Sequence, residues 1–91
     1  MAVTLEEMKA YLRVDFEEDD RLIEGLLSSA GRLCLDILRT DDPALLDSSG
    51  NGKTAVMYAT AYLYEHREEA DHHALTLTLR ALLFGDRKEG F

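Results

Sequence analysis

Gly52, Lys53 and Thr54 are the residue types that close a phosphate-binding P-loop, so they are the first candidates for chemistry in this chain. That motif also needs a glycine five positions before the Gly-Lys pair, where its backbone approaches the phosphates. Asp47 occupies this position, and its carboxylate would repel a phosphate. No strand pattern precedes the run, as a P-loop requires. We therefore interpret residues 52–54 as a helix start and not as a nucleotide site.

Asp15, Glu17 and Asp19 alternate in the way that the first ligands of an EF-hand loop do. An EF-hand needs glycine at its sixth position, for a sharp turn, and glutamate at its twelfth, as a bidentate ligand. The corresponding residues are Asp20 and Leu26. The acidic run is therefore interpreted as a solvated connection between helices, and no calcium site is predicted.

The three histidines and the single cysteine complete the set of possible ligands and nucleophiles. His66 and His73 flank a predicted junction between helices, and His72 cannot easily share a face with His73. Neither a pair of cysteines nor an HExxH pattern supports a metal site there. Cys34 lies within an apolar helical stripe without a neighbouring histidine, which favours a buried, inert thiol. We predict no catalytic, cofactor-binding or metal-binding residue, and no enzyme.

Composition narrows the classes of protein that remain. The chain has 91 residues, enough for one domain (1–91), and a net charge of −8. Such a charge argues against a protein that binds nucleic acid through phosphate contacts, which need a basic face. One cysteine cannot form an internal disulfide, which favours a reducing compartment. No apolar run approaches the roughly 20 residues of a membrane span. We expect a soluble, acidic, intracellular protein.

The hydrophobic periodicity predicts an all-α fold, a small bundle of about four helices with a long central helix. Thr4 and Glu7 form a capping-box pattern before a first helix that ends near Arg13. The central helix begins near Asp19 or Asp20, whose carboxylate can cap it, and ends near Arg39. Its apolar stripe is wide enough for more than one partner surface: Ile23, Leu26, Ala30, Leu33 and Ile37, flanked by Leu22, Leu27, Cys34 and Leu38.

Later segments are less regular. Residues 41–52 are predicted to be a flexible loop in which Asp42 and Pro43 start one short helical turn. A third helix is expected from Lys53 to Ala70, and a fourth from His73 to Phe84 with Gly85 as its cap. The alternation of Leu75, Thr76, Leu77, Thr78 and Leu79 also fits a strand, but no partner strand is apparent, so a helix is predicted. The polar tail, 85–91, is expected to be flexible.

Four segments in this order resemble the gp6-like head–tail connector proteins of long-tailed phages. They are TLEEMKAYLRVD (4–15), DDRLIEGLLSSA (19–30), AVMYATAYLYEHRE (55–68) and LRALL (79–83). The third is similar to the family's apolar run with its Tyr-Glu-x-Arg-Glu type of ending. The resemblance covers most of the chain apart from residues 41–52 and the tail.

This resemblance implies a structural protein of the virion, located at the head–tail interface and assembled in the host cytoplasm. It implies a dodecamer-like homo-oligomeric ring beneath the portal protein that extends the DNA channel. The ring joins head to tail after DNA packaging, with a stopper or tail-completion protein as its other partner. Encapsidated DNA would pass through without specific binding, which an acidic surface suits. The alternative is a small helical interaction module or regulatory subunit without catalytic activity, which would be a monomer or a two-fold dimer.

Overall fold

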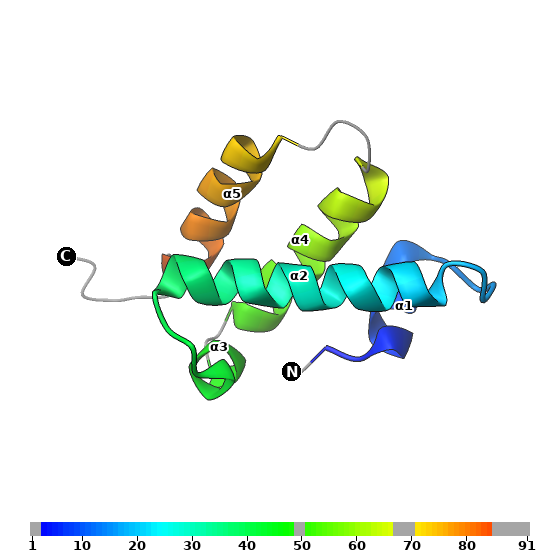
Figure 1. Cartoon of the computed structure of the whole chain (residues 1–91), viewed down its shortest axis with the longest axis horizontal. Coiled ribbons are helices and arrows are strands. Elements are labelled where there is room, and N and C mark those ends of the chain that lie inside the picture. Colours follow the sequence, from blue (N-terminus) through cyan, green and yellow to red (C-terminus); the bar gives the residue numbers. More distant parts are fainter. Residues whose placement is uncertain (1–2, 49–50, 67–70, 85–91) are drawn as a thin grey trace.

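The computed structural model describes residues 3–48, 51–66 and 71–84. These residues form five α-helices and no strand, so the prediction of an all-α bundle with a long central helix is confirmed (Figure 1). The helices are α1 (Leu5–Leu12), α2 (Asp20–Leu38), α3 (Pro43–Ser48), α4 (Gly52–Glu65) and α5 (His72–Phe84). α2 runs the length of the molecule in Figure 1. α4 crosses it, and α5 returns beside α4 as the second arm of a hairpin.

The first helix begins as the sequence predicts. The Thr4 hydroxyl accepts from the Glu7 amide at 3.1 Å, and the Glu7 carboxylate accepts from the Thr4 amide at 3.0 Å. This reciprocal capping box satisfies two backbone donors that a helix otherwise leaves open. The helix ends before Arg13, which adopts a left-handed conformation with φ of 61°. Arg39 ends α2 in the same way, with φ of 59°.

The buried face of α2 coincides with the predicted stripe only in part, because it combines residues from the centre of that stripe with residues from its flank. Ile23, Leu27, Ala30 and Cys34 are buried at its centre. Leu26, Leu33 and Ile37, which the stripe placed in the middle, are only half-buried. This face is the one that α4, the main partner of α2, covers where it crosses, with Ala55, Val56 and Ala59 fully buried. Small alanines let the two helices approach closely.

Segment boundaries differ from the predictions in two places. The short turn predicted within residues 41–52 is the longer helix α3, and its predicted start is confirmed, because Pro43 is its first residue and Asp42 accepts from the Ala44 amide at 3.0 Å. The buried side chain of Leu46 anchors it to the core. The third predicted helix, α4, ends at Glu65 and not at Ala70, because the backbone of His66 leaves the helical conformation. Gly85 and the tail lie outside the described residues.

The alternating leucines of residues 75–79 form a helix and not a strand. Leu75, Leu79 and Leu83 are spaced at four residues and are all buried, whereas Leu77 is exposed. A strand would have placed Leu75, Leu77 and Leu79 on one face. The prediction of a helix over these residues is therefore confirmed.

Candidate interaction surface

The Gly-Lys-Thr run contributes to packing. Gly52 is the buried first residue of α4, and a β-carbon at this position would lie 2.0 Å from the carbonyl oxygen of Leu46. Only glycine permits α3 and α4 to meet so closely. Lys53 forms an ion pair with Glu7, which joins the start of α4 to α1. The Asn51 side chain donates to the carbonyl of Leu82 at 2.9 Å and joins the same region to α5.

The acidic run before α2 is divided between structural contacts and solvent. Asp19 is the residue directly before α2. The sequence predicted that a carboxylate here would cap the helix, but the Asp19 side chain makes no capping hydrogen bond. It accepts instead from the Tyr64 hydroxyl at 2.6 Å, across to the end of α4. Asp20 Oδ1 lies 2.7 Å from Lys9 Nζ, so the two side chains form an ion pair. This oxygen is buried and has no hydrogen bond of good geometry, so the ion pair is what stabilises it.

Lys9 is held in a strongly acidic environment. Contact with Asp20 raises the pKa of its ammonium group, and the nearby charges of Glu17 and Asp15 add to this effect. The ion pair of Lys9 with Asp20 therefore joins α1 to the start of α2. Asp19 and Asp20 contact different helices, Asp19 on α4 and Asp20 on α1.

All three histidines are exposed; His66 follows α4, and His72 and His73 begin α5. The His66 ring stacks on Tyr62 with ring centroids 4.2 Å apart, and its Nδ1 lies 2.9 Å from the Tyr62 carbonyl oxygen. The Tyr62 hydroxyl accepts from the Asp71 amide at 3.0 Å, so this tyrosine ties both ends of the turn. His72 and His73 are exposed. Over residues 3–48, 51–66 and 71–84, no three His, Cys, Asp or Glu side chains gather in a way that could hold a metal ion.

Cys34 is buried, as predicted. Burial raises the pKa of its thiol to about 11, so the reactive thiolate is scarce at neutral pH. The thiol lies in the apolar core between α2 and its neighbours. Its role is that of a small core side chain.

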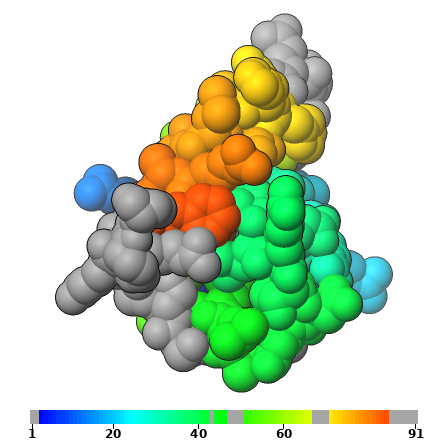
Figure 2. All heavy atoms as spheres, turned by 90° about the vertical axis from the view of Figure 1, so that its left-hand side faces the viewer, coloured from blue at the N-terminus to red at the C-terminus, as the bar shows by residue number. Residues whose placement is uncertain are grey.

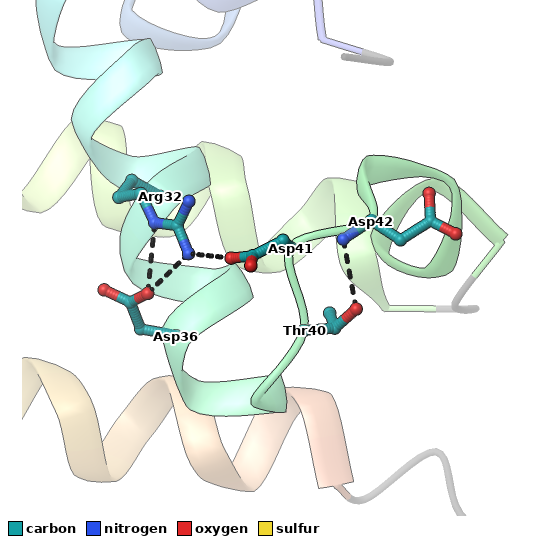
Figure 3. A network of polar contacts seen from close by, with 5 residues as sticks. All are labelled: Arg32, Asp36, Thr40, Asp41 and Asp42. Carbon is teal, nitrogen blue, oxygen red and sulfur yellow. Dashed lines mark hydrogen bonds and ion pairs between the residues drawn. The ribbon is translucent and has the colours of Figure 1, made fainter.

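One surface network was not predicted from the sequence. Arg32 bonds to Asp36 one turn later, at 2.8 Å, and to Asp41 in the connection to α3, at 2.9 Å (Figure 3). The two carboxylates, Asp41 foremost, raise the pKa of the guanidinium. Thr40 accepts from the Asp42 amide at 3.1 Å and turns the chain toward α3. The i,i+4 spacing of Arg32 and Asp36 was visible in the sequence, but the contact with Asp41 depends on the turn.

Several large apolar side chains remain exposed: Tyr11, Phe16, Leu45, Tyr58 and Leu77. They come from different segments and leave apolar surface on several sides of a small domain. Among the described helices, none is both long enough and apolar enough to cross a membrane.

The fold and its surface thus define a small helical protein whose polar contacts serve architecture and whose exposed apolar groups suit assembly. A family profile described as phage gp6-like head-tail connector protein matches residues 2–81, so the chain belongs to this family of structural virion proteins. No curated protein matched the chain, and no solved structure did. Family membership gives the chain a structural adaptor role at the head–tail junction of a phage particle.

Proposed function

We propose that copies of this chain assemble as a ring beneath the portal, extend the DNA channel, and provide the platform to which the tail attaches after packaging. The match of the connector family over residues 2–81 is the observation that carries this proposal. Its partners are further copies of itself, the portal protein and a stopper or tail-completion protein.

The physical properties of the chain support such a role. A single domain of 91 residues buries a limited core, so contacts with neighbours add substantially to its stability. Exposed apolar groups on α1, α3, α4 and α5 offer surface for those contacts. A net charge of −8 disfavours adhesion to DNA that must pass through the channel.

Deletion of the gene in the parent phage tests this function. Without the adaptor, heads should fill with DNA yet fail to join tails, so that electron microscopy shows DNA-filled heads beside free tails. Supplying the wild-type chain from a plasmid should restore joined particles. Normal titres from the deletion phage would contradict the proposal, as would an arrest before DNA packaging.

A further inference from the structure

The exposed surface of α5 combines histidine, apolar and arginine side chains and holds no carboxylate. The helix packs on α4 and α2 through its buried leucines, and Leu77, Arg80 and Ala81 point away from these contacts. Leu77 is 54% exposed. Figure 2 shows α5, in yellow and orange, forming the surface of the upper part of the molecule in that view. We call Leu77, Arg80 and Ala81 the α5 face.

No carboxylate lies within α5, although the chain as a whole has a net charge of −8. The preceding residue, Asp71, caps the helix by accepting from the Ala74 amide at 3.0 Å. Within the described part of the chain, Arg80 makes no ion pair. The α5 face therefore offers an exposed leucine beside a guanidinium that forms no ion pair with any described residue.

A second surface has the opposite charge. Tyr11 and Phe16 are 52% and 45% exposed on α1 and the connection that follows it. Exposed carboxylates surround Phe16 in the sequence: Asp15, Glu17 and Glu18. None of the three forms an ion pair within residues 3–48, 51–66 and 71–84, in contrast to Glu7 and Asp20. We call these five residues the acidic-aromatic surface.

The two surfaces are separate on the molecule. α1 packs on α2 and α4, and α5 packs on the same two helices, but α1 and α5 do not touch each other. In Figure 1 they lie toward opposite ends of α2. One copy can therefore present both surfaces at once to two different neighbours.

We propose that the α5 face of one copy docks on the acidic-aromatic surface of the next copy. Charge complementarity selects this pairing, because Arg80 meets carboxylates and Leu77 meets aromatic rings. Two identical surfaces brought together would oppose like charges. Repeated in one direction from copy to copy, this contact is heterologous, and it forms a ring where the rotation between neighbours closes. This inference builds on the proposed function by naming the faces that a ring would use.

Charge reversal with rescue tests the contact. Sedimentation equilibrium of the purified chain should show self-association that weakens as salt rises. Arg80→Glu should weaken this association by about tenfold, and so should the pair Glu17→Lys and Glu18→Lys. An equimolar mixture of the two variants should regain it, because each can supply the surface that the other has lost. A chain carrying all three changes should regain it as well.

Leu77→Ser and Leu45→Ser form a matched apolar pair, since both leucines are 54% exposed, on α5 and α3. Only Leu77→Ser should weaken association. Circular dichroism checks that every variant is folded.

Three results would overturn the proposed contact: a wild-type chain that stays monomeric to about 1 mM, charge reversals that do not weaken self-association, or a combination of the reversals that does not restore it. Those results leave the deletion phenotype untouched, so the proposed function stands or falls separately.

Discussion

The hydroxyl of Tyr64 donates to the carboxylate of Asp19 at 2.6 Å, and this contact joins the end of α4 to the start of α2. The two residues are 45 positions apart in the chain. The bond holds the acidic connection against the helix hairpin. It therefore fixes where the acidic-aromatic surface sits relative to the core.

Tyr64→Phe removes this hydrogen bond while keeping the ring. Because the acceptor is charged and the contact is partly buried, we expect a loss of about 1–2 kcal/mol in the free energy of unfolding. Urea denaturation measures it. Tyr58→Phe is the control, since Tyr58 is exposed and makes no hydrogen bond that the described residues show. Equal stabilities of the two variants would contradict the role given to Tyr64.

Substitution by alanine should have opposite effects on stability at Gly52 and at Gly25, because the space around the two glycines differs. Gly52→Ala would place a β-carbon against the Leu46 carbonyl and should cost about 1–3 kcal/mol. Gly25 lies exposed within α2, and no atom lies within 4 Å of the place that a β-carbon would take. Gly25→Ala should therefore stabilise the helix by about 0.5–1 kcal/mol. Thermal melts measure the stability of both variants. A Gly52→Ala variant more stable than wild type would contradict the close approach of α3 and α4.

Adjacent leucines on α2 test the corrected position of its buried face. Leu27→Ala should cost about 2–5 kcal/mol, because its side chain is buried in the core. Leu26→Ala should cost clearly less, since Leu26 is half-buried. Chemical denaturation compares the two. A larger loss at Leu26 would support the stripe as predicted from the sequence.

The pH dependence of stability should reveal the contact between Glu7 and Lys53. Lys53 first, and then the Thr4 amide, lower the pKa of Glu7 from its ordinary 4.5. A lowered pKa in the folded state means that the contact stabilises the protein above pH 4.5 and is lost as the pH falls through the folded pKa. Glu7→Gln should thus be less stable than wild type at neutral pH and equally stable in strong acid.

Glu6→Gln is the control for that experiment. It removes the same charge from the same turn of α1, but Glu6 is exposed and forms no ion pair within the described residues. Its stability relative to wild type should change little between neutral and acidic pH. Parallel profiles for the two variants would show that Glu7 gains nothing from Lys53.

Cys34 should resist thiol reagents until the protein unfolds. Its burial and its pKa of about 11 leave little accessible thiolate in neutral buffer. Labelling with a chromogenic disulfide should be complete in denaturant and slow in buffer. Fast labelling of the native chain would place Cys34 outside the core.

The sequence predicted those features that depend on neighbours along the chain. The capping box of Thr4 and Glu7 and the helical leucines of α5 follow from local spacing, and both are confirmed. The hydrogen bond between Asp19 and Tyr64 could not be predicted, because an aspartate directly before a helix normally caps that helix. Its partner Tyr64 becomes visible only once α4 crosses α2. Likewise, nothing in the spacing of Gly52 indicates that Leu46 lies against it.

The charge pattern of the sequence correctly indicated which acidic residues are exposed. The acidic run was interpreted as a solvated connection, and Asp15, Glu17 and Glu18 are indeed exposed. The sequence could not show whether this run is available at the same time as the α5 face. The fold shows this, because α1 and α5 both pack on α2 and α4 without touching each other.

Cryo-electron microscopy of the head–tail junction in intact virions tests the central claim most directly. We expect a closed ring of this chain between portal and tail, with the α5 face of each copy against the acidic-aromatic surface of the next. DNA would run through the ring without contacts to its bases. A junction in which portal and tail proteins meet directly, with no density for this chain, would contradict the proposed function.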